Sequence, residues 1–120
     1  MPDRARSVLV ADDDSGMRKM LRAALERDGY LVFEARSAVD VFRTLDERRL
    51  DVVLLDIDLG MDDGLALGIG LRKEKRFSSL KLVFMTGTFD QPGLLELSSL
   101  WKVPILSKPF DLSALAEAVR

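Results

Sequence analysis

Four short apolar runs of this sequence each end in residues that can handle a phosphoryl group. In chain order, the runs and the residues that follow them are 8–11 with Asp12, Asp13 and Asp14; 52–55 with Asp56; 82–85 with Thr86; and 103–106 with Ser107, Lys108 and Pro109. If these runs are parallel strands, their carboxyl ends meet in one crevice, which is where open α/β sheets bind ligands. The sequence therefore predicts that carboxylates, a hydroxyl and an ammonium group converge there.

Each of these residues also has an ordinary structural interpretation. The acidic run can cap a helix, Asp56 can be a turn residue, Thr86 a strand-end hydroxyl and Lys108 a surface lysine. Capping needs only one acid, however, and three adjacent carboxylates repel one another unless a cation neutralises them. Taken together, the residues favour a site that holds a hard divalent cation, Mg²⁺ or Mn²⁺, on carboxylate oxygens.

The same residues can carry out a phosphoryl transfer. The carboxylate of Asp56 can attack phosphorus as a nucleophile. The three equatorial oxygens of the transferring group each need a partner. The cation can take one oxygen, the Lys108 ammonium a second, and the Thr86 hydroxyl with a backbone N–H the third.

Composition limits the alternatives. The 120 residues, 48% hydrophobic and 32% charged, predict a single globular domain with a packed core around residues 7–119, with no output domain after it. The chain has no His and no Cys, which excludes a serine triad, disulfides and nearly every zinc or copper site. The net charge of −2 gives no general attraction to nucleic acid. With no apolar stretch near ~20 residues, we expect a soluble cytoplasmic protein that does not enter the membrane.

The apolar runs alternate with helical patterns five times. Strands are expected at about 8–11, 31–34, 51–55, 80–85 and 103–106. A first helix is expected with Met17, Met20, Leu21, Ala24 and Leu25 facing inward. A second follows an N-cap at Ser37, a third covers 64–75, and a fourth starts near Pro92. The last starts at Pro109 and Asp111, with Leu112, Leu115, Ala116 and Val119 facing inward. Strands that are apolar throughout are buried on both faces and hence parallel. The sequence predicts an α/β fold, a doubly wound, flavodoxin-like (βα)5 sheet of five strands.

The motifs resemble those of the receiver domains of two-component response regulators, over the whole chain from about Ser7 to Val119. They are Val-Leu-Val-Ala-Asp-Asp-Asp at 8–14, Leu-Leu-Asp-Ile-Asp-Leu-Gly-Met-Asp-Asp-Gly at 54–64, Phe-Met-Thr-Gly at 84–87 and Leu-Ser-Lys-Pro-Phe at 106–110. The resemblance implies a phosphoacceptor rather than an enzyme, with Asp56 taking phosphate from a phosphohistidine. Because the chain has no His, the histidine belongs to a partner, a sensor histidine kinase or a histidine phosphotransfer protein.

The resemblance also implies how the site is assembled. Mg²⁺ would be held by Asp12 through water, by Asp13 and Asp56, and by the backbone carbonyl of Asp58. Thr86, Gly87 and Lys108 would contact or respond to the phosphate. The bond between Lys108 and Pro109 is expected to be cis, since the free-energy cost of the cis form is small in X–Pro bonds.

Three positions depart from the family pattern. Gly60 stands where the family usually has proline, and Gly87 where it often has alanine, so we expect looser loops beside the site. Ile105 stands where the family usually has Tyr, Phe or His, a ring that swings inward when the threonine moves. We therefore expect that an aliphatic side chain changes the usual coupling to an output partner or domain, whose identity the residues do not give.

Two other functions remain open. One is a pseudo-receiver, an interaction module with the fold and without phosphotransfer. The other is a haloacid dehalogenase-like phosphatase, which Asp56-Ile57-Asp58 also resembles, although that motif normally lies on the first strand.

Two surfaces are candidates for partners. Leu94, Leu97 and Trp101 have core spacing, whereas Leu95 and Leu100 offer an apolar patch that leaves a homodimer open. Arg18, Lys19 and Arg22 are interpreted as a solvated face, with a kinase-docking edge as the alternative.

Overall fold

The computed structural model describes residues 5–87 and 93–120, and it has the predicted alternation of strands and helices. The strands are β1 (Ser7–Ala11), β2 (Leu31–Ala35), β3 (Val52–Asp56), β4 (Asp58–Leu59), β5 (Asp62–Asp63), β6 (Lys81–Thr86) and β7 (Ile105–Ser107). The helices are α1 (Ser15–Arg27), α2 (Ala38–Glu47), α3 (Gly64–Lys73), α4 (Leu94–Trp101) and α5 (Leu112–Val119), with a short 3₁₀ turn, η1 (Lys75–Phe77). The helix start expected near Pro92 lies outside the described residues.

Five strands form one parallel sheet in the order β2-β1-β3-β6-β7. Every residue of β1 and of β3 is buried, which confirms the inference from their unbroken apolar runs. The strand order reverses direction between β1 and β3, so the chain leaves these two strands toward opposite sides of the sheet. This topological switch point is where ligands bind in doubly wound folds.

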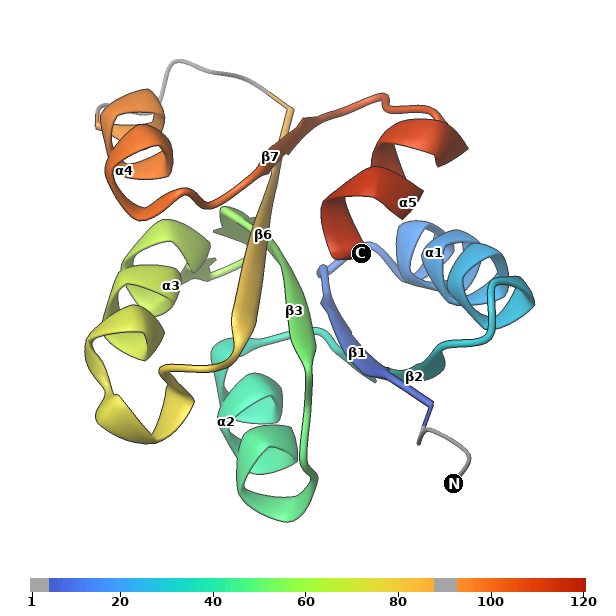
Figure 1. Cartoon of the computed structure of the whole chain (residues 1–120), viewed down its shortest axis with the longest axis horizontal. Coiled ribbons are helices and arrows are strands. Elements are labelled where there is room, and N and C mark those ends of the chain that lie inside the picture. Colours follow the sequence, from blue (N-terminus) through green and yellow to red (C-terminus); the bar gives the residue numbers. More distant parts are fainter. Residues whose placement is uncertain (1–4, 88–92) are drawn as a thin grey trace.

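The helices cover both faces of the sheet. In Figure 1, α1 and α5 lie on one side, and α2, α3 and α4 lie on the other. Alternate residues of a strand face the two layers of helices. In β1, Val8 and Val10 pack with α1 and α5, whereas Leu9 and Ala11 pack on the opposite face of the sheet. Over the described part of the chain, no helix is long and apolar enough to cross a membrane.

Side-chain caps fix where the helices begin. The carboxylates or hydroxyl of four residues accept hydrogen bonds from backbone N–H groups of the first helical turn; they are Asp14 for α1, Ser37 for α2, Asp63 for α3 and Asp111 for α5. The expected cap at Ser37 is thus confirmed. All four caps lie at the carboxyl edge of the sheet, because helices that follow parallel strands start there.

Two residues expected in the core are half exposed. Met20 on α1 and Leu112 on α5 keep 47% and 49% of their surface accessible, and with Phe110 they line a shallow apolar groove between the two helices. Periodicity predicts that they face inward because they are apolar, but the groove between α1 and α5 leaves both side chains open to solvent. The fifth strand also begins two residues later than expected, at Ile105, because Pro104 has no N–H to donate to the sheet.

Candidate functional site

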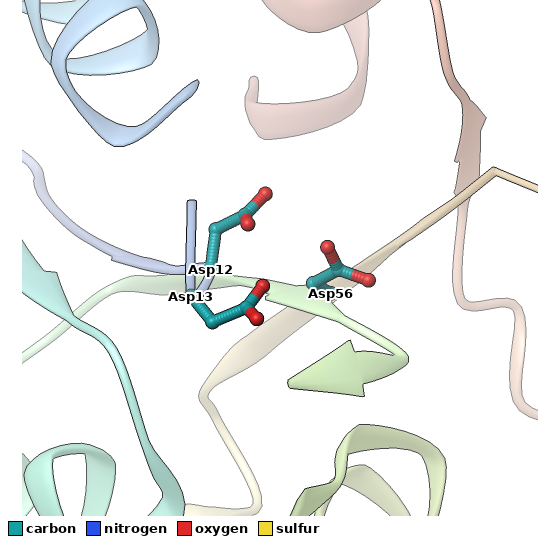
Figure 2. Close-up of side chains that lie close together, drawn as sticks. All are labelled: Asp12, Asp13 and Asp56. Atoms are coloured by element: carbon teal, nitrogen blue, oxygen red, sulfur yellow. The ribbon is translucent and has the colours of Figure 1, made fainter. Parts of the chain in front are cut away.

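Three carboxylates lie together at the carboxyl edge of the sheet. Figure 2 shows Asp12 and Asp13 from the end of β1 beside Asp56 from the end of β3. One carboxylate oxygen of each lies within 4.8 Å of the others. Asp12 and Asp56 are buried, whereas Asp13 is exposed. The structure therefore brings together the three acids that the sequence assigned to a metal.

Asp56 is held by a hydrogen bond on each of its two oxygens. Its Oδ1 accepts from the backbone N–H of Asp58 at 2.9 Å, and its Oδ2 accepts from Lys108 Nζ at 2.6 Å. Burial of this carboxylate, which is 5% exposed, raises its pKa above the usual value, and the hydrogen bond from Lys108 offsets only part of that effect. The side chain is oriented before any ligand arrives.

Lys108 joins two of the acids. Its Nζ lies 2.8 Å from Asp12 Oδ2 and 2.6 Å from Asp56 Oδ2. Burial alone would lower the pKa of this ammonium group, but the hydrogen bonds to Asp12 and Asp56 and the attraction of their charges together outweigh burial and raise the pKa. Lys108 therefore carries a full positive charge next to the acceptor at neutral pH.

Thr86 is the last residue of β6, and Lys108 directly follows the neighbouring strand β7. Asp56 is the register partner of Met85, so Thr86 comes one residue beyond the end of β3, and its side chain is buried. The backbone N–H of Lys108 donates to the carbonyl of Thr86 at 2.7 Å. The bond between Lys108 and Pro109 is cis. Gly87 is exposed, and a Cβ added to it would meet no atom within 4 Å.

A short hairpin that the sequence did not predict lies beside the acids. Strands β4 and β5 pair antiparallel around Gly60, whose φ is +67°. Proline cannot adopt this backbone conformation, because its ring locks φ near −65°. A Cβ on Gly60 would also lie 3.2 Å from Asp13 Oδ2. Gly60 thus has a specific role: it lets the hairpin turn directly against a carboxylate of the site.

The start of α3 lies equally close to Asp56. A Cβ on Gly64 would come within 1.9 Å of the Asp56 carbonyl oxygen. The N–H of Gly64 donates to the carbonyl of Ile57 at 2.9 Å, which closes the loop after β3. Only glycine permits this approach of helix to strand.

The acidic cluster fits a hard divalent cation. Carboxylate oxygens are the donors that Mg²⁺ and Mn²⁺ take. The three carboxylates exceed the Lys108 ammonium by two negative charges, which is the charge that a divalent cation would balance. The cluster thus has both the donor atoms and the charge that such an ion requires.

Ile105 lies on β7 opposite Phe84 of β6 and is only partly buried. Its aliphatic side chain packs against the core layer shared with α3 and α4. The position thus contributes to packing between the edge strand and the core.

One expectation about α1 is wrong. Arg18 was interpreted as part of a solvated face, but its side chain is only 15% exposed. Its Nη1 donates to the carbonyl of Asp12 at 2.7 Å, and its Nε donates to Glu34 of β2 at 3.1 Å. The sequence held no direct signal for this contact, because it joins residues of β1, α1 and β2 that only the fold brings together.

We predict that Asp56→Asn stabilises the metal-free protein by about 1 kcal/mol at pH 7. The folded-state pKa of Asp56 lies above its usual value of 3.8, so the ionised carboxylate lowers stability at neutral pH. The penalty disappears as the pH falls below the unfolded pKa, and the two proteins should then converge. Urea denaturation in the presence of a chelator measures the difference. The exposed neighbour Asp58, changed to Asn, is the control, and an equal gain from both substitutions would contradict the prediction.

Fold and site together define a class of protein: a doubly wound α/β domain with a buried carboxylate, a lysine and an acidic pair at its topological switch point. A model of the response regulator receiver domain matches residues 8–120. The chain belongs to this family, and it is a receiver domain of the kind used in two-component systems. Receiver domains are phosphoacceptors rather than classical enzymes.

Known relatives agree with this assignment. The chain is 28% identical to sporulation initiation phosphotransferase F of Bacillus subtilis, with 94% of this chain and 90% of the relative covered. It is also 28% identical to the transcriptional regulatory protein GltR of Pseudomonas aeruginosa, but it spans only 46% of that protein's length. Several curated relatives thus carry a further region that this chain does not match.

Solved structures show the same fold. The chemotaxis response regulator CheY4 of Vibrio cholerae has a TM-score of 0.83 at 21% identity, with 95% of each chain covered. The response regulator TrrA of Thermotoga maritima, solved in complex with Mg(2+)-BeF, has a TM-score of 0.79 at 27% identity, with 95% of this chain and 96% of that chain covered.

Proposed function

We propose that Asp56 accepts a phosphoryl group from the phosphohistidine of a partner. The observation that carries this proposal is the buried Asp56 carboxylate, with Lys108 Nζ at 2.6 Å and two further acids within metal-binding distance. A carboxylate oxygen of Asp56 forms a bond to phosphorus while the P–N bond of the donor breaks. The electron pair of that bond stays on the imidazole nitrogen of the donor.

Different groups around Asp56 would each bind one oxygen of the transferring phosphoryl group. Asp12, Asp13, Asp56 and the backbone carbonyl of Asp58 would hold Mg²⁺ or Mn²⁺, which when bound supplies positive charge to one phosphoryl oxygen. Lys108 would pair with a second oxygen. The Thr86 hydroxyl, with the backbone N–H of Gly87, would bind the third. The complex of the relative TrrA with Mg(2+)-BeF supports the choice of ion.

The proposed partners follow from what the chain itself lacks. It contains no His, so the phosphohistidine belongs to a sensor histidine kinase or a histidine phosphotransfer protein. We propose that phosphorylation moves Thr86 and changes the surface offered to an output partner or domain. With isoleucine at 105 in place of a ring, that change would differ in form from the usual rotation of an aromatic side chain.

Intact mass after incubation with acetyl phosphate and Mg²⁺ tests the proposal. The parent chain should gain one phosphoryl group, and a chelator should prevent the gain. Asp56→Asn should gain none. Asp14→Asn, which keeps the cap of α1 and removes a neighbouring acid, should gain one as the parent does.

The other outcomes of this experiment favour the alternatives. An unmodified parent chain would leave a pseudo-receiver that only binds partners. Repeated turnover of a phosphate ester would indicate a phosphatase, because a receiver takes one group and then stops.

A further inference from the structure

Asp12 is held from four directions. Its backbone N–H donates to the carbonyl of Ala35 at 3.0 Å, and its backbone carbonyl accepts from Arg18 Nη1 at 2.7 Å. Its Oδ1 accepts from the N–H of Asp14 at 2.9 Å, and its Oδ2 accepts from Lys108 at 2.8 Å. Three of these contacts come from the backbone or from the site itself. The fourth comes from a charged side chain on the next helix.

The direction of the Arg18 guanidinium is fixed by Glu34. Arg18 Nε donates to Glu34 Oε1 at 3.1 Å while Nη1 of the same planar group reaches Asp12, so one rigid group spans both acceptors. Arg22 Nη1 holds the other oxygen of Glu34 at 2.8 Å. The exposed fraction of the side chain falls from 42% at Arg22 to 15% at Arg18. The ion pair between Arg18 and Glu34 is therefore better shielded from solvent than the pair between Arg22 and Glu34.

We propose that Arg18 is a positioning residue of the metal site: through its bond to the Asp12 carbonyl, backed by Glu34, it sets the place of the first acid in the cluster. The proposal rests on the proposed function, because it concerns the affinity of that site for Mg²⁺. Groups that orient a metal ligand from behind commonly change metal affinity by tenfold or more when removed.

The chain offers a matched control. Arg18 and Arg22 lie one turn apart on α1, and both form an ion pair with Glu34. Only Arg18 also contacts Asp12. Replacing either by alanine removes one positive charge and one ion pair with Glu34. Arg22 also pairs with Glu26 on the exposed side of α1, whereas only Arg18→Ala loses a contact to Asp12.

Titration calorimetry of the metal-free chains with MgCl₂ provides the test. We expect Arg18→Ala to bind Mg²⁺ about tenfold more weakly than the parent. We expect Arg22→Ala to bind within about twofold of it, in line with the small contribution of exposed ion pairs. Arg18→Lys should recover part of the loss, because an ammonium group keeps the charge and reaches one acceptor but lacks the planar fork. Without metal, the amide NMR signals of Asp13 and Asp14 should shift in Arg18→Ala and stay in place in Arg22→Ala.

A rate measurement separates positioning from chemistry. The Mg²⁺ concentration that gives half of the maximal rate of phosphorylation by acetyl phosphate should rise about tenfold in Arg18→Ala, because the loss lies in the affinity for the ion. Should Arg18→Ala fail to fold, Glu34→Gln tests the same support: it keeps the shape of the side chain and is expected to weaken Mg²⁺ binding about threefold.

The outcomes distinguish the two proposals. If the parent binds no Mg²⁺, the proposed function and this inference are both wrong. If the parent binds the ion and the Arg18 and Arg22 variants bind it equally well, only the inference is wrong.

Discussion

Lys108→Ala is expected to slow phosphoryl transfer from acetyl phosphate to Asp56 about a hundredfold. This is the usual effect of removing one hydrogen-bond donor that stabilises the negative charge of a transition state. The Nζ of Lys108 lies 2.6 Å from Asp56 Oδ2, so it stands beside the carboxylate that would bond to phosphorus. Its raised pKa keeps it charged over the whole working pH range, so the loss should not depend on pH near neutrality.

The same substitution should have the opposite effect on the cation. The ammonium group occupies Oδ2 of Asp12 and Oδ2 of Asp56, so it competes with a metal for the same carboxylates. Its removal should tighten Mg²⁺ binding about tenfold, since like charges at close range disfavour one another.

Rates from intact mass and affinities from calorimetry measure the two effects. Lys19→Ala is the control: it removes the same charge from an exposed position on α1. A Lys108 variant that is as fast as the parent, or that binds Mg²⁺ more weakly, would contradict this view of the site.

Gly64→Ala is expected to lower the free energy of unfolding by about 3 kcal/mol, at the upper end of the range for overpacking. The added methyl would lie 1.9 Å from the Asp56 carbonyl oxygen and 2.8 Å from Ile57 Cα. Both are backbone atoms, so the strand end or the helix start must move. Phosphorylation of Asp56 should decline with stability, because that movement displaces the acceptor.

Gly70→Ala on the same helix is the matched comparison. Nothing lies within 4 Å of a Cβ at Gly70, and alanine favours the helix by about 1 kcal/mol over glycine. The two substitutions should therefore change stability in opposite directions in a urea titration. A Gly64 variant as stable as the parent would show that helix and strand separate easily there.

The sequence predicted the sheet and most of the site for one physical reason. Strands buried on both faces must be apolar throughout, and parallel strands place their following residues at one edge, so Asp12, Asp56 and Thr86 could be assigned to a common crevice before any geometry was known. The cap at Ser37 followed from a local rule of hydrogen bonding. The grouping of Asp12, Asp13 and Asp56 needed nothing more.

What the sequence did not predict depends on contacts between distant segments. The role of Arg18 arises because α1 packs beside β2 and the end of β1. From the sequence alone, an arginine on a helix predicts an exposed side chain. Met20 and Leu112 were placed inward from periodicity, which shows the direction of a side chain but not whether a neighbouring helix covers it. The β4–β5 hairpin depends on a positive φ at Gly60, and glycine alone does not signal that.

The hydrogen bond from the Lys108 N–H to the Thr86 carbonyl joins the main chains of the two residues proposed to bind phosphate. A displacement of the Thr86 backbone would therefore also strain or move the backbone at Lys108. In this way the proposed response to phosphate would involve the ends of β6 and β7 together, without an aromatic ring at position 105.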